Sequence, residues 1–586
     1  MIRSGIKKTY KSRGVNMINL RENPFYLSDQ DIKWVNETLS SMTTEEKVGQ
    51  LFCLHGMDKD EKKLKEIIEK FKPGGFMFRP DKGKAIQEVH RFLQEQSAIP
   101  LLLAANLEAG GNGIALDGTA VANPMQTAAT GNLEIAYKLG EIAGKEGSAV
   151  GCNWSFAPVV DIDLNFRNPI TNIRTFGSDV STIIKMSKEY VQALQENGIA
   201  ASIKHFPGDG VDERDHHLVT SVNSLTVEEW DRTYGIIFKE LIEAGTKTIM
   251  PGHIMLPHYS RKLRPDIKDE EIMPATLSKE LLQNLLREQL QFNGVIVSDS
   301  TMMAGFAMAK NREEAVPLSI EAGCDIFLFN RDIQEDFEFM MKGLENGLLT
   351  MERIEEAATR VLALKASLGL HKKELATLVP REEELKVLGC QEHKEWASIA
   401  ADESITLVKD TKQLLPISTD QYRRVLLIPV ENINSQLKAE GFYSKSYNES
   451  LADKLRKNGF EVVLFDPNQN FGASFMTPTY TIKEQYDLVI YLANLPTVSV
   501  KPTLRLQWSP MLAGDLPWFI QEVPTIFISL ANPYHLFDIP RVPVMINCYH
   551  ANDDVIDSLY LKLTGESKFK GKSPVDPFCG CWDTKM

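Results

Sequence analysis

A polar segment at residues 204–217 holds the side chains with the most informative chemistry. It reads KHFPGDGVDERDHH and directly follows an apolar run, which is typical of a functional loop after a buried strand. Within it Asp215 and His217 are two residues apart, so a turn can bring the carboxylate against one ring nitrogen. A carboxylate in that place fixes the tautomer of the imidazole and raises its basicity. The pair could therefore give and take protons as a general acid/base.

Further polar side chains stand at the carboxyl ends of predicted strands. They are Asn106, Glu108, Asp161, Asp163, Lys204, His205, His253 and Asp299. In a parallel barrel these strand ends meet at one face, which is where active sites lie. A single polar residue there more often satisfies a local hydrogen bond, but so many strand ends together favour a site.

Metal binding is an alternative reading of the polar segment. Ligand types occur at His205, Asp209, Asp215, His216 and His217. No H-x-x-x-H pair is present, however, and Lys204 would repel a cation while suiting a hydroxyl-rich or anionic ligand. We therefore expect no metal. We also expect no cofactor, because neither a G-x-G-x-x-G turn nor a P-loop follows a predicted strand.

Several motifs together resemble the N-acetylglucosaminidase branch of glycoside hydrolase family 3. They are KHFPG followed by D-x-H, NWSFAPVVDI at 153–162 and VSDS at 297–300. The resemblance runs from MTTEEKVGQLF at 42–52 through PGGFMF at 73–78 to RVLALKASLGL at 360–370. In addition, ADESITLVKD at 401–410 is similar to the start of the second domain of longer members.

The resemblance implies a retaining exo-β-glycosidase and assigns roles to particular residues. Asp299 would be the nucleophile, and Asp215 with His217 the acid/base dyad. A retaining enzyme needs these two functions, one to attack the anomeric carbon and one to protonate the departing oxygen. The residues expected to contact the sugar are Lys204, His205 and Arg174, together with Asn106, Glu108, Asp161 and His253 from their strand-end positions. His216 is expected to matter little.

Two departures from the family pattern bear on specificity. The family reads DQEGGR where this chain has NLEAGG at 106–111, and KHFPGHG where it has Asp209. Asn106 lacks the charge of the usual aspartate, and the usual arginine is missing at Gly111. The glycone is therefore expected to differ from plain N-acetylglucosamine.

Three functions fit these residues. The favoured one is hydrolysis of terminal β-linked N-acetylglucosamine or a related sugar. Phosphorolysis through the same covalent intermediate is an alternative, because an imidazole, unlike a carboxylate base, need not repel phosphate. A non-catalytic sugar-binding barrel is the third, and retention of Asp299, Asp215 and His217 argues against it. The sequence does not separate hydrolysis from phosphorolysis.

Repeated βα units would position these residues. Amphipathic patterns such as 133–150 and 180–197 alternate with apolar runs between about residues 45 and 332. The runs are Val48–His55, Gly75–Arg79, Pro100–Glu108, Trp154–Ile162, Ala201–Gly208, Thr246–His253, Asn293–Ser300 and Cys324–Asn330. Eight parallel strands predict an N-terminal (β/α)8 TIM barrel.

A chain of 586 residues exceeds what one hydrophobic core supports, so a second domain is expected. We predict a tail or upstream-start extension at 1–16, the barrel at 17–370, a linker at 371–395 and a smaller C-terminal α/β sandwich domain at 396–586. Strands of the second domain are predicted at Arg424–Val430, Glu461–Phe465, Leu488–Leu492 and Thr525–Leu530. No catalytic cluster is visible there, so we expect this domain to supply stability or assembly.

The composition limits which classes of partner the protein is expected to bind. The net charge of -14 opposes a nucleic-acid partner, and no apolar stretch is long enough for a membrane span. Seven scattered cysteines and the lack of an apolar run near the start predict a cytoplasmic protein. The expected partner is a small oligosaccharide or glycoside, and a homo-oligomer is left open.

Overall fold

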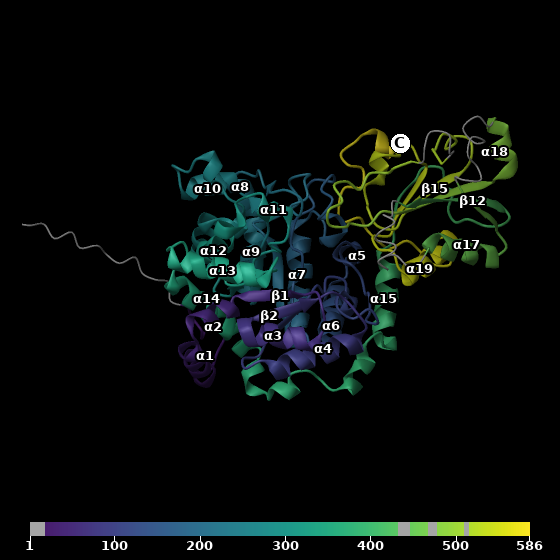
Figure 1. Cartoon of the computed structure of the whole chain (residues 1–586). Coiled ribbons are helices and arrows are strands. Elements are labelled where there is room, and N and C mark those ends of the chain that lie inside the picture. The colour runs from purple at the N-terminus through teal and green to yellow at the C-terminus, as the bar shows by residue number, and fades with distance from the viewer. Residues whose placement is uncertain (1–17, 432–445, 467–477, 509–514) are drawn as a thin grey trace, which may run out of the picture.

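The computed structural model describes residues 18–431, 446–466, 478–508 and 515–586. Two α/β domains lie side by side, the N-terminal one at the left of Figure 1 and the C-terminal one at the right. The tail predicted at 1–16 lies outside the described residues. Within the described ranges, no helix is long and apolar enough to cross a bilayer.

The N-terminal domain is built on eight parallel strands in the order β10-β1-β2-β3-β4-β5-β7-β9. They are β1 Phe52–Gly56, β2 Gly75–Phe78, β3 Leu102–Ala105, β4 Trp154–Ser155, β5 Ala200–Phe206, β7 Thr248–Pro251, β9 Val295–Ile296 and β10 Phe327–Leu328. A parallel bridge between Val297 and Ile326 joins the two ends of the sheet. The predicted (β/α)8 barrel is confirmed.

Most of these strands are shorter than the apolar runs that predicted them. The run Trp154–Ile162 gives a strand that ends at Ser155, since Pro158 cannot donate to a ladder. Pairing nevertheless resumes further along, where the N–H of Val160 donates to the carbonyl of Lys204 at 2.8 Å. The carboxyl ends of the strands are therefore irregular, and this frees their side chains to face a cavity.

Helices cover the outside of the barrel, and apolar side chains fill its inside. Leu102, Trp154, Met250, Val295 and Leu328 pack together in the interior. The main helices are α1 Asp29–Ser41, α2 Thr44–Gln50, α3 Glu61–Phe71, α4 Gly83–Gln96, α6 Leu133–Ala149, α7 Val180–Glu196, α9 Ile236–Glu243, α12 Arg312–Ala322, α13 Ile333–Glu345 and α14 Met351–Ser367. The π-helix Glu280–Gln289 and the short helices α5 Pro124–Thr130, α8 Val227–Trp230, α10 Pro257–Leu263 and α11 Ala304–Ala307 complete the layer.

The C-terminal domain contains a six-stranded sheet in the order β11-β16-β15-β14-β12-β13. The strands are β11 Thr406–Asp410, β12 Arg424–Glu431, β13 Glu461–Leu464, β14 Leu488–Asn494, β15 Thr525–Ser529 and β16 Val544–Asn547. Only the β11–β16 pair is antiparallel. Helices α15 Gln391–Ser404, α17 Tyr447–Lys457, α18 Thr479–Gln485 and α19 Asp553–Leu563 pack on it. The smaller α/β domain is confirmed, although β11 and β16 were not predicted.

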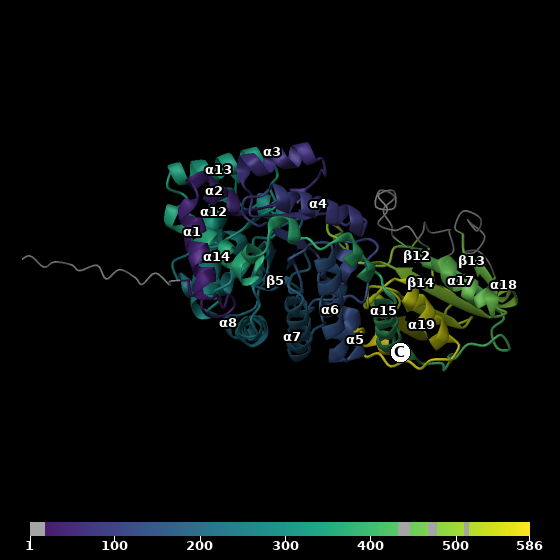
Figure 2. The ribbon, with the colours of Figure 1, turned by 90° about the horizontal axis from the view of Figure 1, so that it is seen from below.

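The connection between the domains runs along the barrel in short 3-10 turns. These are Leu370–Lys372, Leu375–Thr377 and Glu382–Val387. Helix α15 then packs against α5 and α6 on its barrel side and against α19 on the other (Figure 2). The linker boundary predicted at residue 395 falls inside α15, and the division into domains at that residue stays a prediction.

Buried hydrogen bonds join the two domains at the loops that follow β4. The hydroxyl of Tyr534 donates to Oδ2 of Asp163 at 2.6 Å, and the amide of Asn172 donates to Oδ1 of Asn532 at 3.2 Å. Burial raises the pKa of Asp163 to about 6. This strand-end carboxylate therefore serves the domain contact.

Replacing Tyr534 by Phe tests that contact. The substitution leaves a buried oxygen of Asp163 without its donor, so the free energy of unfolding should fall by about 1–3 kcal/mol. Thermal denaturation of the full chain measures the loss, and Tyr480→Phe at a 65% exposed position is the matched control. Equal midpoints for the two variants would contradict the proposed role of the hydroxyl.

Candidate active site

A cavity of about 500 Å³ opens at the carboxyl ends of the barrel strands. Six of the predicted site residues line it: Asn106, Arg174, Lys204, His205, His217 and Asp299. Apolar side chains of Met77, Phe156, Met250 and Leu328 form other parts of its wall. The volume is within the range of small-molecule sites.

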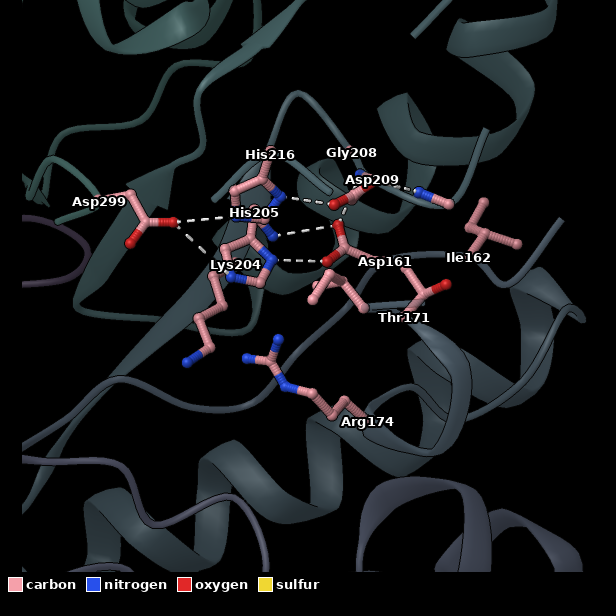
Figure 3. Close-up of polar contacts among 12 residues, drawn as sticks. Asp161, Ile162, Thr171, Arg174, Lys204, His205, Gly208, Asp209, His216 and Asp299 are labelled. Atoms are coloured by element: carbon pink, nitrogen blue, oxygen red, sulfur yellow. Dashed lines mark hydrogen bonds and ion pairs between the residues drawn. The ribbon is translucent and has the colours of Figure 1, made fainter. Parts of the chain in front are cut away.

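Asp299 follows β9 and is held by its backbone on both sides. Its N–H donates to the carbonyl of Pro251 at 3.1 Å, and its Oδ1 accepts from the N–H of Ser300 at 2.7 Å. Oδ2 points toward two imidazoles, 3.3 Å from Nε2 of His216 and 3.9 Å from Nε2 of His205 (Figure 3). Burial alone would raise its pKa, but the two rings hold that pKa well below the ordinary range. The carboxylate is therefore ionised, as a nucleophile must be.

His216 lies between two carboxylates. Its Nδ1 is 2.6 Å from Oδ2 of Asp209, on the side opposite Asp299 (Figure 3), and the ring is fully buried. Burial disfavours the charged ring, but Asp209 and Asp299 outweigh it and raise the pKa of His216 to about 10. The ring is thus a fixed cation beside the nucleophile. The expectation that His216 matters little does not fit this geometry, because the turn that forms the D-x-H pair also directs His216 inward.

His217 and Asp215 form the predicted dyad. Nδ1 of His217 lies 2.6 Å from Oδ1 of Asp215, which also accepts from the N–H of His217 at 2.8 Å. The His217 ring stacks on that of His216, with centroids 4.5 Å apart. Burial and the charge of His216 lower the pKa of His217. Its protonated form is therefore a ready proton donor.

The C-terminal domain reaches the dyad. The N–H of Val500 donates to Oδ2 of Asp215 at 2.9 Å, and Ser499 and Val500 line the cavity. Val500 has a φ of 66°, which a β-branched residue rarely adopts. This contact bears on the expectation that the domain supplies stability or assembly rather than chemistry, which stays a prediction. The domain contacts Asp215 through one backbone N–H. Every residue type except proline has such a group, so the sequence gives no sign of the contact.

Glu108 holds two cations at the side of the cavity. Its carboxylate accepts from Nε and a terminal nitrogen of Arg174 at 3.0 and 2.9 Å, and Nζ of Lys204 lies 2.7 Å away. Although burial acts in the other direction, the two cations keep the pKa of Glu108 far below its ordinary value. The cationic ends of Lys204 and Arg174 point toward one another (Figure 3). Glu108 lines a neighbouring cavity of about 340 Å³, so it orients the two cations from behind.

Two residues predicted to contact the sugar lie outside the wall of the cavity. Asp161 is almost fully buried, and its oxygens bind Nδ1 of His205 at 2.7 Å and the N–H of Asp209 at 2.8 Å. His253 is fully buried, with Nδ1 3.0 Å from the Thr276 hydroxyl and Nε2 3.0 Å from the Ser300 carbonyl. A position at a strand end predicts the face of the barrel on which a residue lies, but not whether its side chain points into the cavity. Both residues support neighbours of the cavity.

Replacing His216 by Ala removes the cation beside Asp299. We expect kcat/KM to fall by about a hundred- to a thousandfold, as when a preorganised electrostatic partner is lost. Asp209→Asn should give a smaller loss, because the ring remains. The exposed His258 provides the control His258→Ala, and a His216 variant as active as that control would overturn the assignment.

Val500 can be tested with two substitutions that differ in the N–H. Val500→Pro removes the donor to Asp215 and also excludes the positive φ of this residue, so kcat for glycosides with poor leaving groups should fall about ten- to a hundredfold. Val500→Gly keeps the donor and suits a positive φ, so it should stay near the wild-type rate. Steady-state kinetics measures kcat of both variants, and circular dichroism checks that each is folded like the wild type. A fully active Pro variant would show that the contact is dispensable.

Three of the known proteins similar to this chain match it over nearly its whole length. A β-N-acetylglucosaminidase/β-glucosidase from Cellulomonas fimi is 46% identical over 570 residues, which cover 97% of this chain and all of that protein. A solved structure titled β-glucoside phosphorylase BglX bound to 2FGlc is 45% identical, with a TM-score of 0.90 over 96% of this chain and 99% of that one. A family 3 β-N-acetylglucosaminidase from Paenibacillus sp. str. FPU-7, 24% identical with a TM-score of 0.75, covers 92% of this chain and 100% of its own and supports the fold alone.

The sequence model of the glycosyl hydrolase family 3 N-terminal domain matches residues 43–364. This range contains the barrel strands and all the predicted catalytic residues. Together with the full-length relative, it shows that the chain is an enzyme that belongs to glycoside hydrolase family 3.

Proposed function

We propose that the enzyme is a retaining exo-β-glycosidase that removes a terminal β-linked N-acetylglucosamine or glucose from small glycosides. The observation that carries the proposal is the placement of an ionised Asp299 and the imidazole of His217 on the wall of one cavity. Lys204 and Arg174 supply donors for sugar hydroxyls from the same wall.

The first step transfers the glycosyl group to the enzyme. A carboxylate oxygen of Asp299 attacks the anomeric carbon, and the bond to the leaving oxygen breaks. The protonated ring of His217 gives its proton to that oxygen. Asp215 keeps the ring oriented through Nδ1, so that Nε2 is the nitrogen that transfers the proton.

The second step releases the sugar. His217, now neutral, removes a proton from a water molecule whose oxygen attacks the anomeric carbon, and Asp299 leaves as a carboxylate. The cationic His216 stabilises Asp299 as it regains its negative charge. Two inversions give net retention of the β configuration.

Two observations support the proposal that the enzyme accepts both N-acetylglucosamine and glucose as the terminal sugar. The Cellulomonas fimi protein is named for action on both N-acetylglucosaminides and glucosides. Asn106 lines the cavity where the family pattern has an aspartate, and its Oδ1 lies 3.4 Å from Nζ of Lys204. The neutral amide of Asn106 can both donate to and accept from sugar hydroxyls, whereas a charged aspartate only accepts.

A second candidate is phosphorolysis through the same intermediate. The structure titled β-glucoside phosphorylase, 45% identical to this chain, favours it. The lowered pKa of His217 favours it too, because a weak base activates water poorly whereas a phosphate anion needs no deprotonation. A phosphate oxygen would attack the anomeric carbon, and the product would be the β-configured sugar 1-phosphate.

Aryl β-glucosides and aryl β-N-acetylglucosaminides, assayed with and without phosphate, test both candidates. A hydrolase gives the free sugar at a rate that phosphate leaves unchanged. A phosphorylase turns over faster with phosphate and forms a sugar 1-phosphate that is visible by phosphorus NMR. No turnover of either glycoside under either condition would contradict the proposal as a whole.

Asp299→Asn tests the nucleophile. The variant should fold normally, since Asp299 stands at a strand end, but glycosylation should be abolished because an amide does not attack the anomeric carbon. In the wild-type enzyme a 2-deoxy-2-fluoro glycoside should label the peptide that contains residues 297–300, as mass spectrometry can show. Activity close to wild type, or a label on another peptide, would refute the assignment.

A further inference from the structure

Three buried ligand atoms converge beside the nucleophile. Oδ2 of Asp299 is 3.3 Å from Nε2 of His216 and 3.9 Å from Nε2 of His205, and the three atoms lie within 4.8 Å of one another. Among the described residues, neither Oδ2 of Asp299 nor Nε2 of His216 has a hydrogen-bond partner of good geometry. These two atoms form an ion pair with each other at 3.3 Å without a hydrogen bond of good geometry, so a ligand that contacts all three atoms would supply bonds that this arrangement lacks.

Each of the two rings is oriented by a carboxylate on its other nitrogen. Nδ1 of His205 lies 2.7 Å from Asp161, and Nδ1 of His216 lies 2.6 Å from Asp209 (Figure 3). In metal sites this outer carboxylate fixes the ring and strengthens the nitrogen that faces the ion. Both histidines of the cluster therefore have the support that metal-binding histidines have.

We propose that His205, His216 and Asp299 form an inhibitory site for a transition-metal dication such as Zn²⁺. Two imidazoles and one carboxylate are a common ligand set for this class of ion, with remaining positions open to water. Bonds of about 2.0–2.1 Å place tetrahedral ligands about 3.3 Å apart. The 3.3 Å separation of Asp299 and His216 already matches this value, whereas His205, 3.9 Å from Asp299, must move closer to complete the ligand set.

His216 carries a proton on Nε2 when it pairs with Asp299, so the metal ion replaces that proton, which passes to solvent. The surrounding charges permit this exchange. Lys204 lies close enough to repel a cation, but its Nζ is paired with Glu108 at 2.7 Å, which offsets its charge. Asp161 and Asp209 add two negative charges behind the rings. An ion in this site would occupy Asp299, so it would block the step assigned to that residue in the proposed function, on which the inhibitory effect rests.

Calorimetric titration of the metal-stripped full chain with ZnCl₂ tests the site without any need for turnover. We expect one ion per chain, with affinity lowered at least tenfold in His216→Gln and in His205→Gln. Asp209→Asn should lower it about ten- to a hundredfold through the loss of ring orientation. Circular dichroism confirms that each variant is folded, and the conservative glutamines guard against collapse of the cavity.

Two control variants remove other ligands of the same kinds. His258→Ala and the double variant Cys579→Ser/Cys581→Ser should bind Zn²⁺ as the wild type does. No binding to wild type, or binding that the His216 and His205 variants retain, would overturn the proposal. Inhibition should also be competitive with an aryl β-glycoside and reversed by EDTA. Tight binding at the triad without competition would leave the metal site standing and refute Asp299 as the sugar-facing nucleophile.

Discussion

A buried cation between two carboxylates is the interaction on which the rest of the site depends. His216 lies between Asp209 and Asp299, and the pairing keeps the ring charged in a place where burial would otherwise neutralise it. In return the ring keeps Asp299 ionised. Burial lowers the pKa of the stacked His217, and the charge of His216 lowers it further. The charge of one buried ring therefore lowers the pKa of both Asp299 and His217, which favours the charged form of the first and the neutral form of the second.

The two domains are coupled through the same segment of chain. The loop that carries His216 also carries Asp215, whose second oxygen is bound by the N–H of Val500 from the C-terminal domain. The barrel carries the candidate catalytic side chains, and the second domain contacts one of them, Asp215. The hydrogen bond between Tyr534 and Asp163 also joins the two domains. A small displacement of one domain would therefore change the distance between Val500 and Asp215. The acid/base is thus a property of the assembled chain.

The sequence predicted the barrel and the second domain, because apolar runs are local signals. The motifs that resemble the family singled out Asp299, Asp215 and His217 as candidate catalytic residues. Asp161 and His253 lie outside the cavity wall, since a position at a strand end does not tell whether a side chain faces the cavity. The prediction that His216 matters little rests on the D-x-H spacing, which gives no sign that Asp209 pairs with this ring. Val500 could not be found at all, as a backbone donor 285 residues from Asp215 has no signature in residue type.

The central claim is that two adjacent histidines have separate tasks, His216 for the nucleophile and His217 for the proton. Pre-steady-state kinetics with an activated aryl glycoside tests this most directly, because such a leaving group needs no protonation. His217→Ala should show a burst of aryl release, slow turnover and a covalent intermediate on Asp299 that mass spectrometry detects. His216→Ala should show slow release with no burst. A burst in the His216 variant and none in the His217 variant would contradict the account.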